Sequence, residues 1–171
     1  MDCFAQKCIA SLFILLVAGC ASYSGSGLTP GMSTLDEVIH DMGQPAMQWS
    51  DADVGMQLAY PRGPNGVHTF MIYLDVDGRL VRIENVMKEA TFELVRPGMK
   101  PAEVLRLLGP SEPGWTTYYQ ARNELVWEWR FCDAWSQRGR FDVKFDNTSG
   151  LVRSSKSRPE ECGKKECKCS R

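Results

Sequence analysis

The chain has 171 residues, with 20 Lys or Arg against 21 Asp or Glu, so its formal net charge is −1. A content of 43% hydrophobic and 24% charged residues is typical of a folded globular protein and not of a disordered one. The near-neutral charge argues against a nucleic-acid partner, because neutralising phosphates requires an excess of Lys and Arg, and only His40 and His68 are available for imidazole chemistry.

The first expected element is a signal peptide over residues 1–19. It contains an apolar run of 11 residues, 8–18, which is too short to span a bilayer and matches the apolar region of a secretory signal. The run ends in Leu-Val-Ala-Gly-Cys, with the cysteine at position 20. This sequence resembles the lipobox of bacterial lipoproteins; the alternative is an ordinary signal peptide followed by a chance cysteine.

The lipobox resemblance implies that Cys20 is the first mature residue and carries a diacylglycerol. Two or three acyl chains would then hold the protein stably on a membrane. Ala21 follows the cysteine, where an Asp is usual for retention at the inner membrane, so the resemblance implies the outer membrane and a periplasm-facing protein. Residues 20–27 are polar and small, as expected of a tether.

A short sequence then occurs twice. Residues 30–45 read PGMSTLDEVIHDMGQP, and residues 97–110 read PGMKPAEVLRLLGP. Both place Pro-Gly-Met before apolar residues at helical spacing, and both reach a glycine that favours the end of a helix. In the first copy Ser33 and Asp36 have the spacing of a capping box, and in the second Pro101 suits a first helical turn. This self-similarity predicts two related structural units.

After each predicted helix the apolar residues recur at every second position, which is the periodicity of a strand. The expected strands are residues 56–60, 69–74 and 79–86, and then residues 124–131, 140–145 and 151–155. We therefore expect an α+β fold of two tandem units, each a short helix packed on a three-stranded antiparallel meander. The units span residues 28–88 and 94–157, and the short linker between them lacks glycine and proline, so they should pack together.

The lipobox and the two Pro-Gly-Met helices with their meanders resemble the SmpA/OmlA family of outer-membrane lipoproteins, the BamE-like group. The resemblance implies a non-catalytic accessory in the assembly or stability of outer-membrane β-barrel proteins, with the β-barrel assembly machinery as a candidate partner. The BamE-like subunit of that machinery typically carries one copy of the helix-and-meander unit, whereas this sequence has two. A tandem of such units is also similar to the β-lactamase inhibitory protein, which presents a concave sheet to an enzyme.

The second unit is rich in aromatic residues, and their spacing separates them into two groups. Trp127, Trp129 and Phe131 alternate with polar residues, as on the buried face of a strand. Four others lie off this alternation in loop-like sequence and are candidates for contact with a partner: Trp115, Tyr118, Tyr119 and Trp135.

The tail, residues 158–171, is basic and rich in cysteine. Without the signal peptide and Cys20, four cysteines remain: Cys132, Cys162, Cys167 and Cys169. In an oxidising compartment four thiols can form two disulfides in three pairings. A zinc site is less favoured, because the spacing lacks paired C-x-x-C motifs and a nearby histidine. The basic residues suit either contact with anionic lipid phosphates or a solvated chain end.

No catalytic or phosphate-binding motif is present, and neither histidine has a partner at catalytic spacing. The sequence therefore predicts a protein that is not an enzyme, needs no cofactor and binds no metal. Its expected partners are membrane lipid, through Cys20, and an envelope protein. The alternative is a periplasmic binding protein that inhibits an enzyme.

Overall fold

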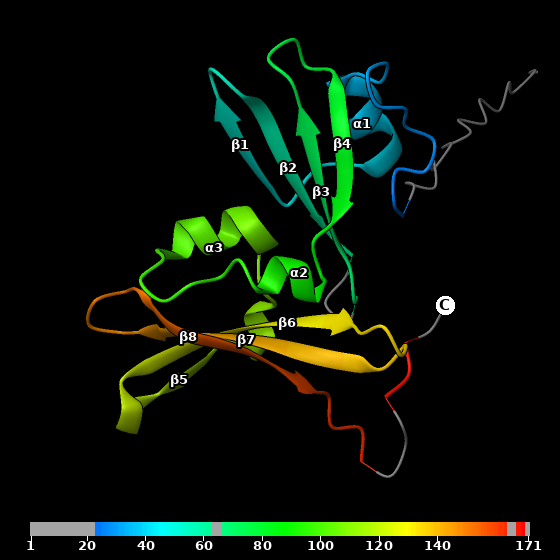
Figure 1. Ribbon diagram of the computed structural model, residues 1–171. Coiled ribbons are helices and arrows are strands. Elements are labelled where there is room, and N and C mark those ends of the chain that lie inside the picture. The colour runs from blue at the N-terminus through cyan, green and yellow to red at the C-terminus, as the bar shows by residue number, and fades with distance from the viewer. Residues whose placement is uncertain (1–22, 63–65, 164–166, 170–171) are drawn as a thin grey trace, which may run out of the picture.

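The computed structural model of the protein describes residues 23–62, 66–163 and 167–169. The expected signal peptide and Cys20 lie outside this part of the chain. Within it the fold is of the α+β class, with two four-stranded antiparallel sheets and a few short helices (Figure 1). None of the helices in the described part is long and apolar enough to cross a membrane.

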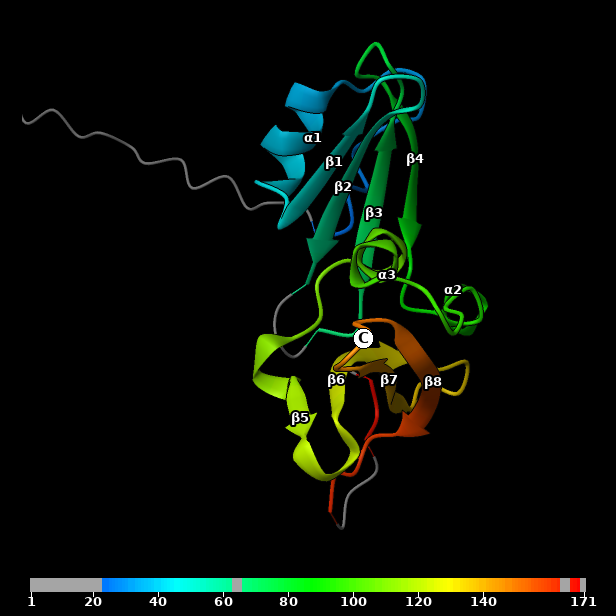
Figure 2. The ribbon, with the colours of Figure 1, turned by 90° about the vertical axis from the view of Figure 1, so that its left-hand side faces the viewer.

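Sheet 1 follows the first helix, α1 (Leu35–Met42). Its strands, in sheet order, are β1 (Met47–Asp51), β2 (Gly55–Pro61), β3 (Thr69–Leu74) and β4 (Leu80–Asn85). α1 covers one face of this sheet (Figure 2), where Val38 and Met42 pack in a cluster with Leu58 and Ile72 of the central strands. The helix is short, and it is stabilised by this packing more than by its own propensity.

α1 begins with a capping box, but one residue later than the sequence pattern predicts. The side chain of Thr34 accepts a hydrogen bond from the amide of Glu37, and the Glu37 carboxylate accepts one from the amide of Thr34 at 2.7 Å. Ser33 instead accepts a hydrogen bond from the amide of Thr29 at 3.0 Å, so its hydroxyl stabilises the turn before the helix.

Sheet 2 follows α2 (Glu89–Phe92) and α3 (Pro101–Leu108). Its strands, in sheet order, are β5 (Thr117–Tyr119), β6 (Glu124–Cys132), β7 (Arg138–Asp146) and β8 (Val152–Pro159). Two 3-10 helices, η1 (Pro113–Trp115) and η2 (Gln120–Arg122), flank β5. Both α2 and α3 lie between the two sheets (Figure 1).

The larger hydrophobic core joins the two sheets. It contains Ala59 from the face of sheet 1 opposite α1, Leu108 from α3, and Trp129 and Phe141 from sheet 2. Phe92 of α2 stacks on Phe141 with 4.1 Å between ring centroids. The two sheets therefore pack together through a shared core, and the predicted buried face of the Trp-rich strand is observed at Trp129 and Phe131.

The three-stranded meanders predicted for each unit are wrong in strand number, because each sheet has four strands. The additional strands, β1 and β5, are edge strands, and neither carries an apolar run of its own. The six predicted strands all occur, but β8 continues to Pro159, two residues past the expected end of the second unit at residue 157. The linker contains the short helix α2.

Candidate functional site

Trp115 is positioned by the 3-10 helix η1 beside the start of sheet 2. Pro113 starts this helix, and the carboxylate of Glu112 accepts a hydrogen bond from the amide of Gly114 at 3.3 Å. The indole ring then lies over two guanidinium groups of the sheet, 4.6 Å from that of Arg130 and 4.0 Å from that of Arg140. Such stacking is favourable because a cation is attracted to the face of an aromatic ring.

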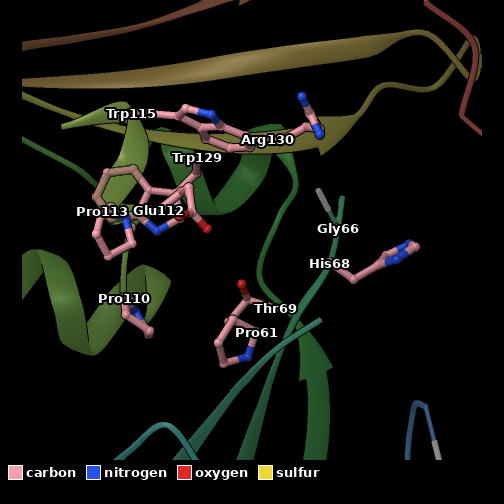
Figure 3. A pocket seen from close by; sticks show the side chains of 11 residues that line it. Pro61, Gly66, His68, Thr69, Pro110, Glu112, Pro113, Trp115, Trp129 and Arg130 are labelled. Carbon is pink, nitrogen blue, oxygen red and sulfur yellow. The ribbon is translucent and has the colours of Figure 1, made fainter. Parts of the chain in front are cut away.

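A cleft of about 300 Å³ lies between the two sheets at this point (Figure 3). Pro61, His68 and Thr69 form the wall on the side of sheet 1. Trp115 and Trp129 lie on the opposite side, close to the prolines around η1. The volume is at the lower limit of small-molecule pockets.

The outer face of sheet 2 is the face directed away from the core. Its residues on β6, β7 and β8 include Val126, Glu128, Arg130, Arg140, Asp142, Lys144, Lys156 and Arg158. Cross-strand register places Arg130, Arg140 and Arg158 in one row over three neighbouring strands. Like charges directly opposite one another are unfavourable, so this row requires anionic partners.

Three carboxylates supply those partners. Arg140 donates to Glu128 and, at 2.6 Å, to Glu160, which also accepts from Arg130. Arg158 donates to Glu128 and, at 3.0 Å, to Asp142. The side chains of Arg130 and Glu160 are only 8% and 6% exposed, so these are largely buried ion pairs held together in one network.

Within this network the pKa values of Glu128 and Glu160 are shifted in opposite directions. Burial raises the pKa of Glu128 above its usual value, and a hydrogen bond with Asp142 adds to this effect, so together they outweigh the two arginines that contact Glu128. Burial is the largest single effect on Glu160 and would raise its pKa, but the hydrogen bonds and positive charges of Arg130 and Arg140 together outweigh it and hold the pKa below the usual value. Glu160 is therefore a fixed anion at the centre of the arginine row.

A second depression, of about 270 Å³, lies on this outer face. Trp115 and Tyr119 form its aromatic side, and Lys144, Lys156 and Arg158 contribute cations. Trp115 lines both this depression and the cleft, and we call the residues that line the two together the Trp115 surface.

The four aromatic residues predicted as contacts do not all meet. Trp115 and Tyr119 both line the Trp115 surface, and Arg122 lies over the Tyr119 ring at 4.2 Å. Tyr118 is next to them on β5, exposed, and donates to the side chain of Asn123 at 3.0 Å. Trp135 is 84% exposed and lies apart from them, in the turn between β6 and β7.

Sequence reasoning missed the arginine row. Arg130 was recognisable only as a polar residue in an alternating strand, and Arg158 falls in the segment expected to be a tail. The available signal was the alternation itself, since three arginines occupy solvent-side positions of consecutive strands. Their alignment depends on strand register, including an irregularity between Lys144 and Phe145 that spacing does not reveal.

Cys132 and the three cysteines of the tail form two disulfides. Cys132 at the end of β6 is bonded to Cys169, and Cys162 is bonded to Cys167. The first bond fastens the tail to sheet 2. The ligand atoms of Cys162, Cys167 and Glu160 lie within 4.8 Å of one another, but a sulfur binds metal as a thiolate, and here the two sulfurs are bonded to each other.

The two histidines differ in their surroundings. His40 is exposed on α1. His68 is half-buried at the cleft, and its ring stacks on Phe70 with 5.8 Å between centroids. Burial lowers the pKa of His68 below its usual value, so its imidazole is neutral at pH 7.

Comparison of the chain with protein-family models, with curated proteins and with solved structures gives no match.

Proposed function

We propose that this protein is an outer-membrane lipoprotein, anchored through an acylated Cys20 and facing the periplasm, that acts as a non-catalytic adaptor for an envelope protein. The lipobox-like sequence motivates the anchor. The adaptor role rests on the Trp115 surface, which combines the partly exposed ring of Trp115 and the exposed ring of Tyr119 with charges held in place. Aromatic residues and arginine are enriched in protein–protein interfaces and dominate their energetics.

The ionic network supports recognition over catalysis. Each arginine of the row donates hydrogen bonds to carboxylates of the same network. The arginines and carboxylates therefore hold one another's side chains in position. Charges that are fixed before binding lose little conformational freedom when a partner arrives, which favours affinity. They also select partners by electrostatic complementarity.

We also propose that the chain contains two BamE-like units in tandem. Corresponding turns support this. Gly31 and Gly98, each in a Pro-Gly-Met sequence, both have positive φ, at 79° and 89°. The amide of Gly31 donates to the carbonyl of Leu80 at 2.7 Å, and that of Gly98 donates to the carbonyl of Val152 at 2.8 Å. Leu80 and Val152 are the first residues of the last strand in their respective sheets.

Photo-crosslinking in intact cells tests the adaptor role. A photoreactive amino acid at Thr117, an exposed residue of β5 that lines the Trp115 surface, should give an adduct with an envelope protein. The matched control is Val76, which is 63% exposed in the turn between β3 and β4. Trp115→Ala should remove the adduct made from position 117. No adduct at 117, or the same adducts from both positions, would show that this surface is not the binding site.

The identity of the adduct separates the two candidate functions. A component of the β-barrel assembly machinery supports the BamE-like role, whereas a periplasmic hydrolase supports the inhibitor alternative. The anchor is tested independently by mass spectrometry of the mature N-terminus, with Cys20→Ser as the control. A mature chain without acyl groups would refute the lipoprotein proposal.

A further inference from the structure

The segment expected to be a free tether is bound to the folded body from Tyr23 onward. The hydroxyl of Tyr23 is 2.9 Å from Nδ1 of His68. Its ring lies edge-on to Phe70, with 5.9 Å between centroids, and the guanidinium of Arg62 is 5.7 Å from its centre. Burial raises the pKa of Tyr23, and the nearby charge of Arg62 only partly offsets it, so the hydroxyl keeps its proton and remains a donor.

The residues after Tyr23 continue this packing. Gly25 is buried, and a β-carbon at this position would lie 2.9 Å from Sδ of Met42 and 3.0 Å from a methyl of Ile83. The amide of Leu28 donates to the carbonyl of Gly25 at 3.0 Å, and Leu28 packs against the cluster beneath α1. Residues 23–28 are therefore part of the fold.

The lipid anchor is consequently close to the body. Only Ala21 and Ser22 lie between Cys20 and Tyr23. An extended chain covers at most about 3.6 Å per residue, so Cys20 lies within roughly 11 Å of Tyr23. A bilayer that holds acyl chains on Cys20 must therefore lie next to the side of the molecule that carries Tyr23.

In Figure 1 the start of the described chain, drawn in blue, and the turn between β6 and β7 both lie on the right-hand side. The carboxylate of Asp133 holds this turn, accepting hydrogen bonds from the amides of Trp135 and Gln137, both at 2.8 Å. The indole of Trp135 is left 84% exposed. At the base of the turn the Cys132–Cys169 bond fastens the basic tail. Figure 2 views the opposite side, where α3 is in front.

We infer that the side carrying Tyr23 and Trp135 rests on the lipid surface, with Trp135 at the level of the headgroups. The inference rests on the proposed acylation of Cys20. Tyr and Trp are enriched at membrane interfaces because each has an apolar ring and a polar group. The anchor fixes one point of the molecule, and Trp135 supplies a second point in the other sheet, so the two together set its tilt. In this orientation α3 and β5 lie away from the membrane.

Fluorescence on vesicles tests this orientation. A chain starting at Cys20 keeps every residue that the structure describes, and its Cys20 can be coupled to a maleimide lipid in phosphatidylcholine vesicles. Lipids brominated close to the headgroup should then quench part of the tryptophan emission. Trp135→Phe should lose most of that quenching, whereas Trp49→Phe, a change of the same kind on the edge strand β1, should keep it. Equal quenching of the parent chain and of Trp135→Phe would overturn the inference.

A second variant tests the role of Tyr23. Tyr23→Ala should free the segment, increase the distance of the body from the bilayer and reduce quenching of Trp135. Tyr118→Ala, at a comparably exposed tyrosine on β5, is the control and should leave quenching unchanged. Thermal unfolding of each variant establishes that it is folded. Because the lipid is attached chemically, these results do not depend on whether cells acylate Cys20, which the mass of the cellular protein decides separately.

Discussion

Leu108→Ala tests whether the two sheets unfold as one unit. Leu108 is fully buried at the end of α3, in the core that joins the sheets. The next residue, Gly109, contacts both sheets: a β-carbon there would lie 3.4 Å from that of Ala59, and its carbonyl accepts a hydrogen bond from Trp129 at 3.3 Å. A cavity at this position therefore weakens packing on both sides of α3.

The expected cost follows from the loss of buried methyl groups and the cavity that remains. Leu→Ala substitutions in protein cores lower the free energy of unfolding by about 2–5 kcal/mol. For a chain of this length, that corresponds to a fall in Tm of about 4–20 °C. Urea unfolding measures the free energy, and hydrogen exchange followed by mass spectrometry reports β2–β3 and β6–β7 separately.

Both strand pairs should lose protection to the same extent in Leu108→Ala, with a single unfolding transition. Val54→Ala is the control, because Val54 is 75% exposed and surface substitutions usually change stability by less than about 0.5 kcal/mol. If β6–β7 lost protection while β2–β3 kept it, the sheets would be independent domains and the shared core would not couple them.

Three further predictions concern the tail, a turn and acid stability. Replacing Cys132 and Cys169 by Ser should lower the free energy of unfolding by about 2–4 kcal/mol, since the bond closes a long loop; an unchanged urea midpoint would contradict this. Gly55→Ala should destabilise strongly, because φ is 110° and a β-carbon would lie 2.1 Å from a main-chain oxygen of the neighbouring strand. Gly78→Ala, with open space around it, should cost only about 1–2 kcal/mol in the same thermal assay. A hydrogen bond from a backbone amide of its own turn, together with an adjacent arginine, lowers the pKa of Asp146 to about 2. Its stabilising effect should therefore be present above pH 4 and be lost as the pH falls from about 4 to about 2, and an NMR titration midpoint near the ordinary value for Asp would refute this.

Helices and strands that carry a continuous apolar face of their own were predictable from the sequence. Both eight-residue helices and the strand carrying Trp129 follow from apolar spacing, because their buried faces are continuous over several positions. The strands β1 and β5 were not predicted, because an edge strand buries little and takes its register from the strand beside it. Trp49 of β1 and Tyr118 of β5 show this, since both are at least partly exposed in strands that pair along one side only.

The candidate site was predictable only in part, for a different reason. Trp115 stands out because it lies outside the alternating pattern. Its cation partners, Arg130 and Arg140, are ten residues apart in sequence and become neighbours only through pairing of β6 with β7. The disulfide partner of Cys132 could not be predicted from the sequence either, because three pairings are equally compatible with the spacing of four cysteines.

The desolvation cost of the buried ion pairs in the arginine row raises the question of why the row is present. Burying ion pairs costs desolvation energy, and well-packed apolar residues in their place are often as stable or more stable. Arg130 and Glu160 are nonetheless both buried, on a sheet face that could have been covered by apolar side chains. Stability alone therefore does not account for the row. If an envelope protein binds here, as proposed, the cations and carboxylates fixed under Trp115 would add selectivity, because that protein would have to match their arrangement before its own charges could be buried there.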